Sequence, residues 1–120
     1  MATILVAEDN RVNQRMLSFT LRKEGHKVIT TFNGCEALEY LEGNSVDLII
    51  ADIEMPKMDG IALVKQLRAD KLYKTLPIIV LTASGQNQDH LTAIAAGANN
   101  VLTKPSSSQK LIDTIDKILS

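Results

Sequence analysis

Five polar residues of this sequence each follow a short, mostly apolar run, and their side chains are the ones that could do chemistry. They are Glu8, Asp9, Asp52, Thr82 and Lys104. Three carboxylates, a hydroxyl and an ammonium in one place would suit a divalent cation and a phosphoryl group, because Mg²⁺ prefers oxygen ligands and phosphoryl oxygens accept hydrogen bonds. In such a site Asp52 stands where a phosphoryl group could be attached.

The runs before these residues look like buried parallel strands. Their sequences are ILVA at residues 4–7, LIIA at 48–51, IIVL at 78–81 and VLT at 101–103. A parallel sheet covered by helices on both faces has continuously apolar strands, and the carboxyl ends of its strands share the edge where ligands bind. We therefore expect the five polar residues to meet at that edge.

Strand and helix patterns alternate along the whole chain. The expected helices are 10–24 with Asn10 as its cap, 34–42 with Asn33 as its cap, one opening at Asp59 and Gly60, 89–96, and one beginning within 106–108. A further strand is expected at 27–31. This alternation predicts an α/β fold with a single doubly wound, five-stranded parallel sheet, five helices and the flavodoxin-like strand order 2-1-3-4-5. With 120 residues, the chain is expected to form one domain over 1–120.

Composition excludes several classes of function. The net charge is −1 with acids and bases interleaved, whereas nucleic acids and anionic membranes attract a basic excess. No apolar stretch approaches the ~18 residues of a membrane span, and no signal peptide is visible at the start. The single cysteine, Cys35, cannot form an internal disulfide. We expect a cytoplasmic protein that binds neither nucleic acid nor membrane.

Each polar residue also has an ordinary structural interpretation when it is taken alone. Glu8 and Asp9 could cap a helix, Asp52 could belong to a turn, Thr82 could fill a strand and Lys104 could be a solvated surface charge. Their joint occurrence at four strand ends favours a functional site, because none of these roles requires the others.

The motifs around these residues resemble those of the receiver domains of two-component response regulators. The matching motifs are Glu8-Asp9, Asp52 with Met55-Pro56 and Met58-Asp59-Gly60, Thr82-Ala83, and Lys104-Pro105. They occur in the family's order and cover nearly the entire chain. The resemblance implies a phospho-accepting signalling domain rather than an enzyme, with no output domain in this chain.

The resemblance also implies a role for each site residue. Asp52 would accept a phosphoryl group from a phosphohistidine on a sensor histidine kinase or a histidine phosphotransfer protein, and the modified domain would act on a downstream protein. Thr82 and Lys104 would contact the phosphoryl group. The implied Mg²⁺ ligands are Glu8, Asp9, Asp52 and the backbone carbonyl of Glu54.

The sequence departs from the family pattern in two places. Val101 stands where many receivers have an aromatic residue, and Ser106 stands where a large apolar residue is common. A switch based on a rotating aromatic ring is therefore not expected. The resemblance further implies a cis peptide bond between Lys104 and Pro105. Asn10 and Asn13 are similar to the residues at these positions in receivers that are attached to hybrid histidine kinases.

Two other classes of protein share part of this pattern. A phosphatase of the haloacid-dehalogenase type also uses an aspartate nucleophile, but that nucleophile lies on the first strand. An aspartate that acts as general acid follows it two residues later, whereas this chain has Glu54 two residues after Asp52. A flavodoxin-like electron carrier would place its flavin phosphate after the first strand, where Glu8 and Asp9 would repel it.

Overall fold

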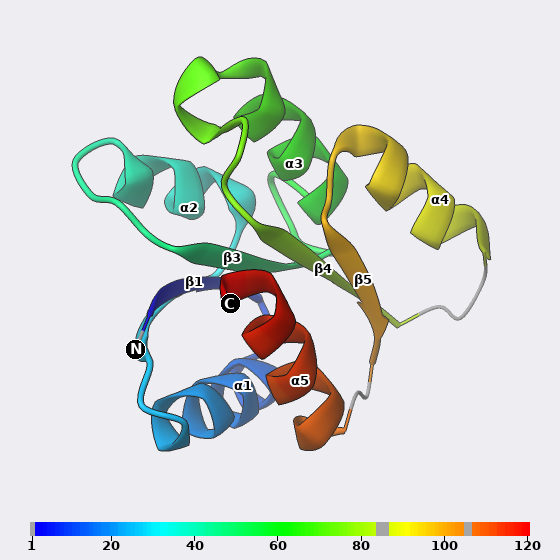
Figure 1. Ribbon diagram of the computed structural model, residues 1–120. Coiled ribbons are helices and arrows are strands. Elements are labelled where there is room, and N and C mark those ends of the chain that lie inside the picture. Colours follow the sequence, from blue (N-terminus) through cyan, green and yellow to red (C-terminus); the bar gives the residue numbers. More distant parts are fainter. Residues whose placement is uncertain (1, 84–86, 105–106) are drawn as a thin grey trace.

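A five-stranded parallel sheet forms the centre of the molecule (Figure 1). The computed structural model describes residues 2–83, 87–104 and 107–120. The strands are β1 (Thr3–Ala7), β2 (Lys27–Thr31), β3 (Leu48–Asp52), β4 (Ile78–Thr82) and β5 (Asn100–Thr103). They pair in the order β2-β1-β3-β4-β5, and every pairing is parallel. The predicted fold class and strand order are confirmed.

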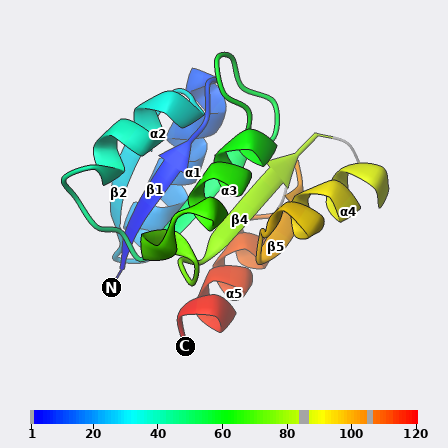
Figure 2. The same ribbon diagram turned by 90° about the horizontal axis from the view of Figure 1, so that it is seen from above.

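Helices cover both faces of this sheet. They are α1 (Arg11–Lys23), α2 (Gly34–Leu41), α3 (Gly60–Ala69), the short 3-10 helix η1 (Lys71–Tyr73), α4 (Asn87–Ala96) and α5 (Ser108–Leu119). α1 and α5 lie on one face, and α2, α3 and α4 lie on the other (Figures 1 and 2). The apolar core is therefore divided into two layers by the sheet.

The strand sequences explain this double layer. In β1, Ile4 and Val6 belong to the core on the α1 and α5 side, whereas Leu5 and Ala7 belong to the core on the opposite side. Successive side chains of a strand point to opposite faces, so a strand that is covered on both faces must be apolar at every position. All four of these residues are buried.

The helices begin where the sequence predicts capping residues. Asn10, Asn33, Asp59 and Ser107 precede α1, α2, α3 and α5, and each side chain accepts a hydrogen bond from a backbone N–H in the first turn. Such caps satisfy donors that have no partner within the helix. The fourth helix begins at Asn87, two residues earlier than expected, and η1 was not expected.

The sequence shows no partner for either histidine, yet each has one in the structure. The histidines have partners, since His26 Nδ1 accepts a hydrogen bond from the Ala2 N–H at 3.1 Å and His90 Nε2 lies 3.4 Å from Thr103 Oγ1. The expectations for Pro105 and Ser106 lie outside the described residues. No helix in the described part of the chain is long and apolar enough to span a membrane.

Candidate functional site

The register of the strands lines up the residues that were predicted to form a site. Ala7 pairs with Ala51, so Glu8 and Asp52 leave β1 and β3 at the same level of the sheet. Asp52 in turn pairs with Leu81, and Thr82 pairs with Thr103. Since the strands are parallel, the residues that end them, and Lys104 after β5, fall on one edge.

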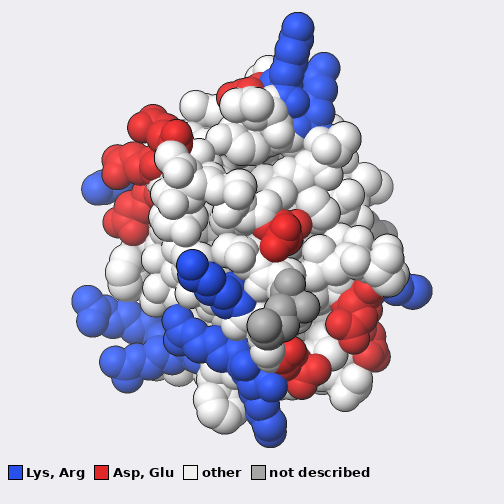
Figure 3. Space-filling model, turned by 60° about the vertical axis from the view of Figure 1, so that its left-hand side comes forward, with Lys and Arg blue, Asp and Glu red and all other residues white. Residues whose placement is uncertain are grey.

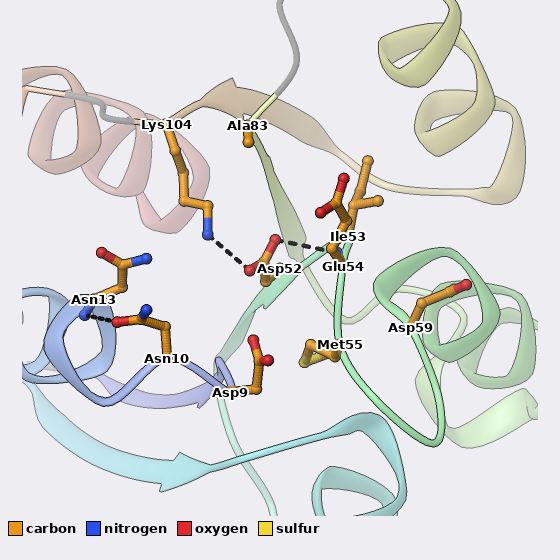
Figure 4. Close-up of a pocket in the computed structure, with 10 residues that line it drawn as sticks. All are labelled: Asp9, Asn10, Asn13, Asp52, Ile53, Glu54, Met55, Asp59, Ala83 and Lys104. Carbon is orange, nitrogen blue, oxygen red and sulfur yellow. Dashed lines mark hydrogen bonds and ion pairs between the residues drawn. The ribbon is translucent and has the colours of Figure 1, made fainter.

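Lys104 joins two of the acids at this edge. Its Nζ lies 2.7 Å from Asp52 Oδ2 and 3.1 Å from Glu8 Oε1. Figure 4 shows the lysine side chain reaching from the end of β5 toward Asp52 at the end of β3. The sequence separations are 52 and 96 residues, so only the folded sheet creates this arrangement.

The three carboxylates also lie close to one another. Glu8, Asp9 and Asp52 each offer a carboxylate oxygen, and these oxygens lie within 4.8 Å of one another. Glu8 and Asp52 are buried, whereas Asp9 is exposed. With all three ionised, one lysine leaves two negative charges uncompensated. This donor set fits Mg²⁺, which takes one or two carboxylates together with water and phosphoryl oxygens.

The crowding of charges changes the protonation of Glu8 and Lys104. Burial and the adjacent carboxyl of Asp52 raise the pKa of Glu8 to about 7, although Lys104 acts against this rise. Burial favours the neutral amine of Lys104, but its contacts with Asp52 and Glu8 outweigh that influence and raise its pKa. The site therefore keeps Lys104 charged and makes the ionised form of the buried Glu8 less favourable than usual.

The loop from β3 to α3 fixes the position of Asp52. The Glu54 N–H donates to Asp52 Oδ1 at 3.2 Å, and the Gly60 N–H donates to the Ile53 carbonyl at 3.0 Å. A Cβ at Gly60 would collide with the carbonyl oxygen of Asp52, so a glycine allows α3 to begin this close to the strand. Lys57 has a φ of 66°, a conformation that is uncommon for residues other than glycine.

Thr82 and Ala83 extend the site along β4. Thr82 is buried at the end of the strand, and its carbonyl accepts a hydrogen bond from the Lys104 N–H at 2.6 Å. Ala83 lines the same open pocket as Asp9, Asp52 and Lys104 (Figure 4). The structure thus places all five predicted residues on one edge, and it draws four of them, Glu8, Asp9, Asp52 and Lys104, into direct proximity.

Two sets of contacts that support the site were not predicted. The buried Gln14 side chain donates from Nε2 to the carbonyls of Glu8 at 3.2 Å and Thr31 at 3.0 Å. The Asn10 N–H donates to Glu8 Oε2 at 3.2 Å. Gln14 could have been suspected because it lies seven residues before Leu21, on the inner face of an otherwise amphipathic helix.

Comparison with known families identifies the class of protein to which this fold and this site belong. The sequence profile of the response regulator receiver domain matches residues 4–116. The chain therefore belongs to the family of response regulator receiver domains. Receiver domains are signalling domains rather than classical enzymes, and they interact with histidine kinases and downstream targets.

Individual relatives are similar to this chain along almost their whole length. The chemotaxis protein CheY homolog of Campylobacter jejuni is 37% identical over 118 residues, which cover 97% of this chain and 91% of the relative. A crystal structure of a putative response regulator from Chloroflexus aurantiacus has a TM-score of 0.95 and 37% identity, with 98% of this chain and 97% of that chain covered.

A third relative bears on the acidic cluster. The receiver domain of the sensor histidine kinase PA1611 from Pseudomonas aeruginosa has a TM-score of 0.91 and 31% identity, with 98% of this chain and 97% of that chain covered. Its crystal structure has a magnesium ion coordinated in the active site cleft. The chain described here has an acidic cluster that could bind a metal at its own sheet edge.

Proposed function

We propose that Asp52 accepts a phosphoryl group from a phosphohistidine and thereby switches the interaction of this domain with a downstream protein. One observation carries the proposal. The Asp52 carboxylate is buried at the end of the central strand, with Lys104 bound to one oxygen and two further carboxylates within 4.8 Å. A purely structural aspartate would not need two more acids beside it.

The transfer breaks the P–N bond of the phosphohistidine and forms a P–O bond to a carboxylate oxygen of Asp52. The imidazole leaves as the donor's neutral or protonated side chain, and no redox change occurs. Lys104 would place its positive charge against the phosphoryl oxygens, and Thr82 would donate its hydroxyl to one of them. Positioning and charge compensation of this kind dominate phosphoryl transfer.

The acidic cluster would hold Mg²⁺ through Glu8, Asp9, Asp52 and the backbone carbonyl of Glu54. The bound ion supplies positive charge that allows a carboxylate and a phosphoryl dianion to approach each other. The chain's own part is to keep these oxygens convergent. The Asn10 and Glu54 amides do so by donating to Glu8 and Asp52, respectively.

The remaining assignments concern the setting of the reaction. We take residues 1–120 as one receiver domain that receives its phosphoryl group from a sensor histidine kinase or a histidine phosphotransfer protein. Cys35 is a free thiol, in agreement with a reducing cytoplasm. Val101 lies on β5 opposite Val80 and has no ring to rotate, so the signal would pass through the backbone beyond Thr82 instead.

Incubation with acetyl phosphate and Mg²⁺ tests the proposal. Intact-mass measurement should show the addition of one phosphoryl group to the wild-type protein, and none to Asp52→Asn or to the wild type in excess EDTA. Asp113→Asn, which changes an exposed acid on α5, is the matched control and should be modified like the wild type. Equal modification of Asp52→Asn would refute the assignment of the acceptor.

A further inference from the structure

A second cavity lies away from the phosphoryl site, between α1 and the free edge of β2. Its volume is about 540 Å³, within the range of small-molecule sites. We call it the α1 flank and define it by the lining residues Arg15, Ser18, Phe19, Arg22, Lys23 and Thr30. β2 is the outermost strand of the sheet, so no further strand covers the outer side of α1 there.

The α1 flank carries positive charge that is not compensated. Residues 11–23 contain four basic residues and no acid, in a chain whose net charge is −1. The ion pairs found among the described residues both involve Lys104, so Arg15, Arg22 and Lys23 have none there. Figure 3 shows Lys and Arg side chains gathered low on the face where this edge of the sheet comes forward.

Helix electrostatics explain only part of this charge. Arg22 and Lys23 lie in the last turn of α1, where cations interact favourably with the helix dipole. Arg15 lies in the middle of the helix and gains nothing from that dipole. The guanidinium of Arg22 also reaches β2, since its Nη2 donates to the Val28 carbonyl at 3.4 Å.

A buried hydroxyl at the α1 flank has no partner. Ser18 is 4% exposed, and its Oγ makes no hydrogen bond within the described part of the chain. A buried polar group without a partner destabilises a fold, and such groups are few in native structures. Ser18 lines the cavity but its Oγ is closed to solvent, so the hydroxyl would turn about χ1 to donate to an acceptor oxygen bound there.

An aromatic ring completes this surface. Phe19 is 69% exposed, which is high for a large apolar side chain. It lies four residues from both Arg15 and Lys23, so the ring and the two cations occupy neighbouring positions along one side of the helix. A flat ring could stack on Phe19 while an attached phosphate reached the basic side chains.

We propose that the α1 flank binds an organic phosphate, that is, a phosphate ester that carries a flat ring. Arg15, Arg22 and Lys23 bind the phosphate oxygens, Ser18 donates to one of them, and Phe19 stacks on the ring. Guanidinium groups match phosphate geometry, which favours phosphate over a simple halide ion. This site is independent of the function proposed for Asp52.

ADP is a suitable probe, and amide chemical shifts of the whole domain provide the readout. In EDTA, which keeps the nucleotide from bridging to the acidic edge through a metal, ADP should cause saturable shifts in α1 and β2. Pyrophosphate should bind more weakly than ADP, and adenosine more weakly still. The absence of saturable shifts with ADP at millimolar concentration would overturn the proposal, and so would binding of ADP no tighter than that of pyrophosphate.

Variants distinguish this site from general attraction between charges. Arg15→Gln combined with Arg22→Gln should weaken ADP binding roughly tenfold or more, because two charge-assisted contacts are lost. Lys110→Gln combined with Lys117→Gln removes the same charge from α5 and should leave binding unchanged. Equal weakening by both pairs would mean nonspecific attraction and would contradict the proposal.

Ser18→Ala provides the sharpest comparison. The substitution removes the unpartnered hydroxyl, so the melting temperature should stay the same or rise while ADP binding weakens several-fold. Asp52→Asn should bind ADP like the wild type, since the two sites are separate. Unchanged ADP binding by Ser18→Ala would show that the hydroxyl plays no part in the site.

Discussion

The acidic edge of the sheet and the α1 flank carry excess charge of opposite sign, yet the net charge of the chain is only −1. At the edge, Glu8, Asp9 and Asp52 face a single ammonium, and two of these acids are buried. At the flank, Arg15, Arg22 and Lys23 are exposed and no acid lines the cavity. The near-neutral net charge of the chain therefore includes a negative excess at the acidic edge and a positive excess at the α1 flank.

The difference between the two regions lies in their access to solvent. Water and salt screen exposed charges, whereas buried charges interact through a less polarisable medium and cannot be rearranged cheaply. Substitutions at the acidic edge should therefore change stability strongly. Substitutions on the α1 flank should change it weakly and in a salt-dependent way.

Removal of the lysine should have the largest effect. Lys104→Met leaves the Glu8 and Asp52 carboxylates without their cation, and breaking such a buried pair costs several kcal/mol. We expect the free energy of unfolding in EDTA to fall by about 2–4 kcal/mol in urea denaturation. Lys110→Met, at an exposed position on α5, is the control. A loss no larger than the control's would mean that the edge is far better solvated than its burial indicates.

The pH dependence of stability should reveal the raised pKa of Glu8. The pKa of Glu8 is raised from 4.5 to about 7 by folding, so the folded state binds more protons than the unfolded state between these values. Stability that is present below pH 4.5 is therefore lost as the pH rises through about 7. In EDTA, the wild type should lose roughly 2 kcal/mol relative to Glu8→Gln over this range.

The exposed variant Glu39→Gln provides the reference for that titration. It should follow the wild type at each pH, because its carboxylate has no comparable environment. If Glu8→Gln and Glu39→Gln gave parallel curves, Glu8 would be ionised normally and the crowding of the edge would not affect its proton.

A smaller effect is expected from the exposed member of the acidic cluster. Asp9→Asn removes one repelling charge, so stability in EDTA should rise by about 0.5–1 kcal/mol. Mg²⁺ at ten times its dissociation constant should stabilise the wild type by about 1.4 kcal/mol, and Asp9→Asn should respond much less. Thermal melts across a Mg²⁺ series test both effects, with Asp113→Asn as the control. If the melting temperature of the wild type did not change across the Mg²⁺ series, the assignment of the metal site would be contradicted.

The smallest effect should come from the α1 flank. Arg15→Glu replaces one of several like charges, so we expect a gain of about 0.3 kcal/mol at low salt. The gain should vanish near 1 M salt, where the screening length is only about 3 Å. Lys117→Glu places an acid four residues after Asp113, in the last turn of α5, and should destabilise instead. A salt-independent gain in Arg15→Glu would point to helix propensity rather than charge.

The apolar strands made most of the fold predictable. Runs such as LIIA before Asp52 can be placed only in a sheet that is covered on both faces, and the capping residues Asn33 and Asp59 located the helices that cover it. Since parallel strands share one carboxyl edge, the same runs brought Glu8 and Lys104 together across 96 residues. The site could thus be inferred because its residues follow strand ends.

Other features could not be predicted, because they depend on three-dimensional contacts. The inner face of α1 contains Gln14 and Ser18, and a pattern based on apolar spacing does not explain buried polar groups. Gln14 is explained only by the two carbonyls that its amide reaches. The partners of His26 and His90 likewise lie 24 and 13 residues away along the chain.

The acyl phosphate expected on Asp52 can be located in the chain directly. Borohydride reduces an aspartyl phosphate to homoserine, so the protein is first treated with acetyl phosphate and Mg²⁺, then reduced, digested and sequenced by mass spectrometry. We predict homoserine at position 52, and none there when Mg²⁺ is replaced by EDTA. Homoserine at another acid, or its formation at Asp52 regardless of Mg²⁺, would contradict a metal-dependent phosphoryl acceptor at this edge.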